Sequence, residues 1–175
     1  MTISRTAAAL FLTATLALTG CGDDDEPAVA TTDTADSAQN NASAYAPPAI
    51  TANEKDLTKE PKSGAGSGAV TKLEIKDLVV GKGTTAKLTD TVTVHYVGTL
   101  FSDGSVFDSS WEGGKPISFS LARVVPGFAQ GIEGMKIGGR RQIVIPAELG
   151  YGAQEIPGIP ANSTLVFIVD LKAIS

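Results

Sequence analysis

The sequence predicts an α+β fold in which an antiparallel sheet wraps one short α-helix. Three observations support this prediction. Several segments after residue 70 alternate apolar and polar residues, short turn sequences separate them, and only one segment has apolar residues at helical spacing. Strands and helices do not alternate along the chain, which disfavours a parallel sheet.

The strand candidates occupy most of the C-terminal part of the chain. Leu73 and Ile75 are followed by the apolar stretch Leu78-Val79-Val80, which precedes the turn sequence Gly81-Lys82-Gly83. In residues 91–100, valines and a tyrosine alternate with threonines and a histidine, so this long strand has two different faces. The turn at 102–105 reverses the chain, and the other strand candidates are 106–107, 117–121, 140–145 and 165–174.

One helix is predicted between these strands. Phe128, Ile132 and Met135 recur at i, i+4 and i+7. Pro126 lies near the start of this pattern and Gly138 lies beyond its end, as is typical of a short amphipathic helix.

The N-terminal residues 1–20 resemble a bacterial lipoprotein signal peptide. A positive end at Arg5 precedes an apolar run over 7–18 that is shorter than the ~20 residues a membrane helix needs. Leu18-Thr19-Gly20-Cys21 resembles the lipobox, in which the cysteine is diacylated and becomes the new N-terminus. Cys21 is the only cysteine of the chain, which excludes an intramolecular disulfide. We therefore expect lipidation at Cys21 and a chain anchored to a membrane at the bacterial cell envelope, facing the periplasm or the exterior.

Residues 21–69 are predicted to form a disordered tether, and residues 70–175 the folded domain. The tether sequence is rich in Asp, Ala, Thr, Pro and Gly and holds few branched apolar residues, so it is expected to bury too little to fold. Nine carboxylates between Asp23 and Glu60 face only three lysines, whereas residues 70–175 are neutral. Since neither part has clustered positive charge, nucleic acid is not expected as a partner.

The composition also disfavours several kinds of enzyme. His95 is the only histidine, and no G-x-S-x-G elbow or cysteine nucleophile accompanies it, so the usual hydrolase sites lack parts. A histidine packed within the sheet is the favoured interpretation. Carboxylates are scattered singly, and the glycine-rich segments lack the helix and Lys-Ser/Thr of a phosphate loop. We therefore expect no metal and no cofactor.

Six longer segments resemble the FKBP-type peptidyl-prolyl isomerase family in their order and separation. They are 92–98 (VTVHYVG), 103–110 (DGSVFDSS), 124–128 (VVPGF), 134–141 (GMKIGGRR), 149–152 (LGYG) and 159–167 (IPANSTLVF). Together they cover nearly all of residues 70–175. The resemblance implies a half-barrel sheet curled around the helix, with a shallow apolar pocket for proline between them.

The same resemblance implies the residues of this pocket. The catalytic positions are Tyr96, Phe107, Asp108, Val125, Phe128, Tyr151 and Phe167. Further substrate contacts are expected from Ile117, Phe119, Val124 and Ile159. Phe128 is a departure, because many relatives carry tryptophan at the floor of the pocket. Asp108 could equally form a local turn with Ser109 and Ser110, and the role of Trp111 stays open.

The activity implied is peptidyl-prolyl cis-trans isomerisation that assists the folding of exported proteins. Rotation about the X-Pro bond needs no nucleophile, because a pocket need only favour the twisted amide. The expected partners are proline-containing polypeptides and rapamycin-type macrolide inhibitors. The alternative is a proline-binding, chaperone-like module with little turnover, although the enclosed pocket favours the enzyme.

Overall fold

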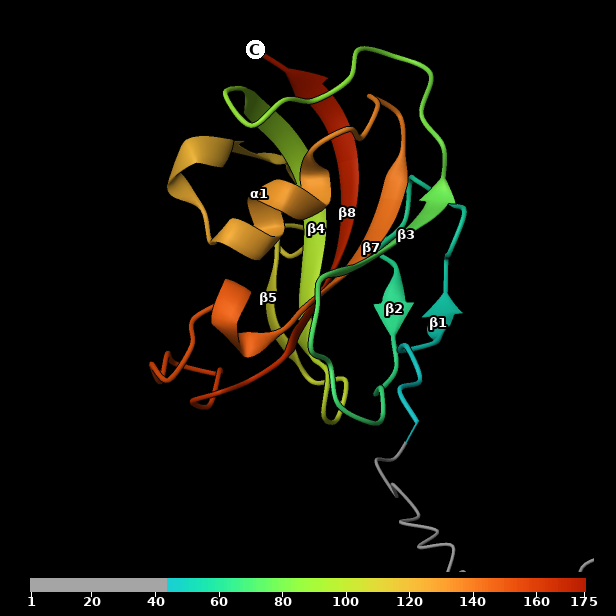
Figure 1. Cartoon of the computed structure of the whole chain (residues 1–175). Helices are drawn as coiled ribbons and strands as arrows, with labels where there is room; N and C mark the ends of the chain where they lie inside the picture. The colour runs from blue at the N-terminus through green and yellow to red at the C-terminus, as the bar shows by residue number, and fades with distance from the viewer. Residues whose placement is uncertain (1–43) are drawn as a thin grey trace, which may run out of the picture. The chain divides into compact units, whose positions relative to one another are not determined.

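The main sheet of the computed structural model, which describes residues 44–175, contains six antiparallel strands (Figure 1). Five of them follow the order β3-β7-β8-β4-β5, and β6 also pairs with β4. Their bounds are β3 Glu74–Val79, β4 Thr91–Leu100, β5 Val106–Ser109, β6 Ile117–Ser120, β7 Arg140–Ile145 and β8 Leu165–Ile174. The predicted α+β class is confirmed.

The helix α1 spans Pro126–Ile132 and lies against one face of the sheet (Figure 1). It is shorter than predicted, because Gly134 takes a left-handed φ of 76° and ends the helical path before Met135. Met135 is nevertheless 2 % exposed and belongs to the core. Two 3₁₀ turns, η1 Leu121–Arg123 and η2 Ala147–Leu149, flank this region.

The longest pairing joins β4 and β8 and places the centre of the core. It runs from Val92 opposite Ile174 to Leu100 opposite Leu165. Leu165, Val169 and Leu171 are fully buried and belong to the same cluster as Phe128 and Ile132 of α1, beside Phe167. Because successive side chains of a strand point to opposite faces, one set of side chains from each of these two strands is directed towards the helix.

The second face of the sheet is covered by residues 44–69, which we call the strap. Its two short strands, β1 Ile50–Ala52 and β2 Lys62–Ser63, pair with each other beside the main sheet (Figure 1). Ile50 packs on the buried cluster of Leu78, Val97 and Ile168. Tyr45 packs on a second cluster and stacks on Phe101 with ring centroids 6.2 Å apart.

The prediction of a disordered tether reaching residue 69 is therefore wrong for residues 44–69. Val97, Val144, Val166 and Ile168 give the sheet a second apolar face that must be covered, and the few apolar side chains of the strap cover it. The strap also supplies carbonyl groups that accept hydrogen bonds from the sheet, such as Pro48 O from Gln142 Nε2 at 2.9 Å. The predicted signal peptide, Cys21 and the tether up to residue 43 lie outside the described residues.

In the part of the chain from residue 44 onward, no helix combines the length and hydropathy needed to cross a membrane.

Candidate active site

A cavity of about 340 Å³ carries most of the predicted site residues. Six of its lining side chains are aromatic, which makes its wall mainly apolar. They come from β4, β5, β6, α1, the loop after η2, and β8. The lining residues are Tyr96, Phe107, Asp108, Phe119, Arg123, Val124, Val125, Phe128, Tyr151 and Phe167.

The aromatic rings meet edge to face around Phe128. Its ring centroid lies 5.0 Å from that of Phe167 at an interplanar angle of 71°, and 6.1 Å from that of Phe119 at 78°. Phe128 is only 5 % exposed, so it forms a fixed apolar floor. Edge-to-face aromatic pairs contribute ~0.5 to 1.5 kcal/mol beyond the burial of their area, which favours this arrangement of rings.

Gly98 on β4 allows the rings of Phe107 and Phe167 to approach each other. Those rings lie 5.6 Å apart at 84°. A Cβ atom on Gly98 would lie 2.6 Å from Cζ of Phe107 and 3.0 Å from Cε1 of Phe167, closer than side chains tolerate. Glycine at this position thus shapes the wall of the cavity.

Tyr96 and Asp108 form the polar pair of the site. The Tyr96 hydroxyl donates a hydrogen bond of 2.5 Å to Oδ2 of Asp108. Burial, together with this hydrogen bond and the negative charge of Asp108, raises the pKa of Tyr96. The phenol therefore stays protonated at neutral pH and acts as a hydrogen-bond donor, not as a base. Of the two roles considered for Asp108, the structure shows the one at the cavity wall.

Val125 brings a backbone N–H to the cavity at the start of α1. It is the N-cap residue, and its carbonyl accepts hydrogen bonds from the N–H groups of Phe128 at 3.0 Å and Ala129 at 3.2 Å. Pro126 follows at the first helical position, where its missing N–H costs nothing. In the described chain the Val125 N–H donates to no backbone carbonyl, so it is available to a ligand.

The structure brings together every predicted catalytic position, as well as Phe119 and Val124, but not two of the predicted substrate contacts. Ile117 on β6 is 42 % exposed and does not line the cavity. Ile159 is 4 % exposed and packs within the core, where it pairs with Ile156. The prediction that these two residues complete the cavity wall is thus wrong: Ile117 faces solvent, and Ile159 is buried in the core.

Arg123 is the one lining residue that the sequence did not indicate. It ends the turn η1, directly before Val124 and Val125, and its side chain is exposed. Its position next to two predicted pocket residues was the only signal that could have identified it. No ion pair within 4.0 Å joins Arg123 to a carboxylate of the described residues.

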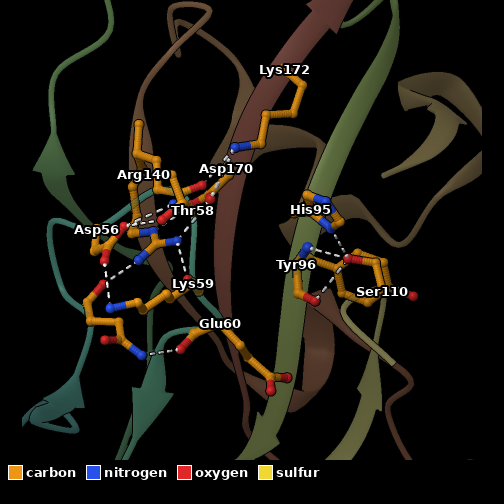
Figure 2. A network of polar contacts seen from close by, with 12 residues as sticks. Asp56, Thr58, Lys59, Glu60, His95, Tyr96, Ser110, Arg140, Asp170 and Lys172 are labelled. Atoms are coloured by element: carbon orange, nitrogen blue, oxygen red, sulfur yellow. Dashed lines mark hydrogen bonds and ion pairs between the residues drawn. The ribbon is translucent and has the colours of Figure 1, made fainter. Parts of the chain in front are cut away.

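His95 lies beside Tyr96 on β4 and has the structural environment that its sequence position predicted. Its Nδ1 lies 3.0 Å from Oγ of Ser110 (Figure 2). Its ring stacks on Trp111 with centroids 4.2 Å apart. Burial and, to a smaller extent, the charge of Lys172 lower the pKa of His95. The role left open for Trp111 is thus one of packing over β4.

Residues 44–175 hold no group of three His, Cys, Asp or Glu side chains arranged to bind a metal ion.

Comparison with known proteins identifies the family. Residues 82–172 match the family model described as FKBP-type peptidyl-prolyl cis-trans isomerase. An FK506-binding protein of Streptomyces anulatus is 47 % identical over 106 residues, which are 58 % of this chain and 86 % of that protein. The FKBP-type peptidyl-prolyl cis-trans isomerase FkpA of Escherichia coli K12 is 53 % identical over 91 residues, which are 52 % of this chain and 33 % of FkpA.

The fold agrees with the sequence relationship. The crystal structure of FkpA from Escherichia coli superposes with a TM-score of 0.57 at 48 % identity, covering 60 % of this chain and 49 % of that one. The chain thus spans a third of the length of the FkpA sequence and about half of its crystallised chain. Family model, relative and fold together show that the chain belongs to the FKBP-type peptidyl-prolyl cis-trans isomerases, a family of enzymes.

Proposed function

We propose that this chain isomerises X-Pro bonds of exported polypeptides at the bacterial cell envelope, with the proline enclosed in the aromatic cavity and the chain held by a lipid anchor at Cys21. The observation that carries the catalytic part is the cavity itself. It is lined by six aromatic side chains and one tyrosine–carboxylate pair, which suits a small apolar ring with polar backbone on either side.

Enclosure favours rotation for a reason of solvation. The barrier of ~18 to 20 kcal/mol arises because rotation breaks amide resonance. Water stabilises the planar, charge-separated amide by hydrogen bonding to its oxygen, and the twisted amide is less polar. A wall made of Phe107, Phe128 and Phe167 removes that water, so it raises the ground state relative to the transition state.

Two donors of the cavity are placed to hold the neighbouring backbone while the bond rotates. The Val125 N–H is available at the start of α1, and the Tyr151 hydroxyl lies in the same lining. Holding the flanking carbonyls in one turn-like geometry restricts the substrate to conformations near the transition state. The same apolar wall and donors would accept a rapamycin-type macrolide, which would then compete with substrate.

The envelope part of the proposal rests on the sequence before the described residues. An apolar run over 7–18 ends in Leu18-Thr19-Gly20-Cys21, directly before an acidic segment. One acyl chain gives only marginal membrane binding, whereas two or more give stable anchoring. Diacylation at Cys21 would therefore hold the isomerase where exported chains emerge unfolded.

The catalytic part is tested with the full-length purified protein and a short peptide containing one X-Pro bond. We expect faster cis-to-trans conversion in proportion to enzyme concentration, and inhibition by rapamycin. A folded protein that binds proline peptides without accelerating conversion would contradict the proposal and favour the chaperone-like alternative.

The anchor is tested by Cys21→Ser in a bacterial host, a change that leaves the apolar run over 7–18 intact. The wild-type chain is expected in the membrane fraction and labelled by a fatty-acid analogue. The variant is expected to lose the label and to leave the membrane fraction as a soluble or uncleaved form. Equal labelling of both proteins would overturn the assignment of Cys21.

A further inference from the structure

The strap contains a loop, residues 53–60, that is fixed on a buried ion pair of the sheet. Arg140 on β7 is fully buried and pairs with Asp170 on β8, donating from Nη2 to Oδ2 at 2.8 Å. The remaining guanidinium donors reach the loop, since Nη1 donates to the carbonyl of Asn53 and Nη2 to that of Lys59 at 3.0 Å (Figure 2). A buried charge is stable only with such partners, so these hydrogen bonds hold the loop in one position on the sheet.

The two ends of this loop are tied together. Asn53 takes a left-handed φ of 54°, and its Nδ2 donates to the carbonyl of Glu60 at 2.8 Å. Within the loop, Asp56 Oδ1 accepts hydrogen bonds from N–H and Oγ1 of Thr58. Lys172 of β8 donates to the carbonyl of Leu57 at 3.1 Å. The backbone of Glu60 is therefore held in a fixed position relative to β7 and β8.

From this position the carboxylate of Glu60 reaches the strand that carries part of the cavity wall. The Ser109 hydroxyl donates a hydrogen bond of 2.6 Å to Oε1 of Glu60. Ser109 is the last residue of β5, directly after the two cavity residues Phe107 and Asp108. In the main sheet β5 pairs only with β4, and the register shifts between Gly98 and Thr99.

The strap contacts the other end of β5 as well. The N–H of Gly66 donates to the carbonyl of Phe101 at 2.8 Å, in the turn that leads from β4 into β5. Gly104 of the same turn packs so closely on Gly64 that a Cβ atom there would lie 2.9 Å from the carbonyl carbon of Gly64. A short edge strand is thus held at both ends by the strap.

We propose that Glu60 is a positioning residue of the isomerase site: by holding Ser109, it fixes β5 and thereby places Phe107 and Asp108 at the wall of the proline cavity. This inference rests on the proposed isomerase function and concerns the same site. Glu60 does not line the cavity and takes part in no bond rotation. It acts through the strand, so its loss is expected to loosen substrate contacts more than it slows the bound reaction.

The test compares Glu60→Ala, Ser109→Ala and the double variant with the wild-type full-length protein. Glu60→Ala is expected to lower kcat/KM on an X-Pro peptide about threefold to tenfold, mostly through a higher KM, as the loss of one hydrogen bond predicts. Ser109→Ala is expected to lower it at least as much, because it also removes the acceptor of the Trp111 N–H at 3.2 Å. The double variant is expected to be no worse than the poorer single variant, because both remove the same bond. Glu60→Gln keeps an acceptor oxygen and is expected to restore most of the activity.

The matched control is Glu54→Ala, which removes a carboxylate of the same loop that forms none of the hydrogen bonds described above. It is expected to leave kcat/KM and the melting temperature unchanged. If the wild type is active and Glu60→Ala matches it, or if the effects of Glu60→Ala and Ser109→Ala simply multiply, the positioning role is wrong while the isomerase function stands. An inactive wild type would instead overturn the proposed function.

Discussion

The hydroxyl of Tyr96 on β4 donates a 2.5 Å hydrogen bond to the carboxylate of Asp108 on β5, so two neighbouring strands are joined by a polar bond at the wall of an apolar cavity. Burial raises the pKa of Tyr96 above its usual value of about 10. The phenol stays protonated throughout the neutral range. Neither Tyr96 nor Asp108 needs to exchange a proton for the X-Pro bond of the substrate to rotate.

The first prediction concerns the pH dependence of activity. Because the raised pKa keeps Tyr96 protonated, kcat/KM on an uncharged X-Pro peptide is expected to be constant between about pH 7 and pH 9. Tyr96→Phe removes the hydrogen bond and is expected to lower kcat/KM tenfold or less, with the same flat profile. A titration with a midpoint inside this range that disappears in Tyr96→Phe would contradict the prediction.

The second prediction separates enclosure from hydrogen bonding. Phe128→Ala removes the floor of the cavity and is expected to reduce turnover severely, whereas Tyr151→Phe removes one hydroxyl and is expected to cost tenfold or less. Truncating a buried Phe costs ~3 to 5 kcal/mol of stability, so activity is compared at a temperature where circular dichroism shows Phe128→Ala folded. Phe128→Trp is expected to preserve activity. Near-normal turnover in a folded Phe128→Ala would refute the assignment of the floor.

The third prediction concerns the strap. A chain that starts at residue 44 is expected to melt at the temperature of the full-length protein, whereas one that starts at residue 70 is expected to melt at least about 10 °C lower. The shorter chain loses the packing of the partly buried Tyr45 on Phe101 and Ile50 on Val97, and full burial of a large apolar side chain sets an upper bound of ~1.5 to 3 kcal/mol for each. Equal melting temperatures would show that the strap adds nothing to stability.

The fourth prediction uses the lowered pKa of His95. Burial favours the neutral imidazole in the folded protein, whereas the unfolded chain titrates near 6.5. Below that pH the unfolded state binds more protons, so His95 makes the folded protein less stable as pH falls through 6.5. When the pH is lowered from 7.5 to 5.5, the melting temperature of the wild type is therefore expected to fall further than that of His95→Gln. An equal or smaller loss in the wild type would contradict the sign.

The fifth prediction assigns a substrate preference to Arg123. Arg123 is the one cationic residue of the cavity lining, so a peptide with Glu before proline is expected to react faster than its Gln counterpart, by up to about fivefold at low salt. Arg123→Gln is expected to bring this ratio to one. Lys115→Gln, which removes a cation outside the cavity lining, serves as the control and should leave the ratio unchanged. A ratio that Arg123→Gln does not alter would exclude the role.

The parts of the fold that the sequence predicted are those with a strong local pattern. The bounds predicted for β4, β7 and β8 agree with the structure, because branched apolar residues between flanking turn residues define a strand locally. The predicted helix extends beyond the observed end of α1 at Ile132. Met135 fits the helical spacing, but it lies after Gly134, where the helical path has already ended.

The strap could not be predicted in the same way, because its order depends on distant partners. Its sequence is polar and rich in small residues, and it folds only against a face formed by β4, β7 and β8. The burial of Arg140 could not be predicted for the same reason. Its guanidinium is buried where carbonyl groups of the distant strap accept its hydrogen bonds. Arg123 was missed because an exposed cation in a turn has no local pattern.

The contacts of the strap also determine when the domain can complete its folding. Its hydrogen bonds join Asn53 to Arg140, Pro48 to Gln142 and Leu57 to Lys172, across 87, 94 and 115 residues of sequence. Loops of this length must close before those bonds form, and domains dominated by such contacts fold in milliseconds to seconds. The strap can pack on the sheet only after its last strand, β8, is present. The domain therefore stays incompletely folded during synthesis until the residues of β8 have been added.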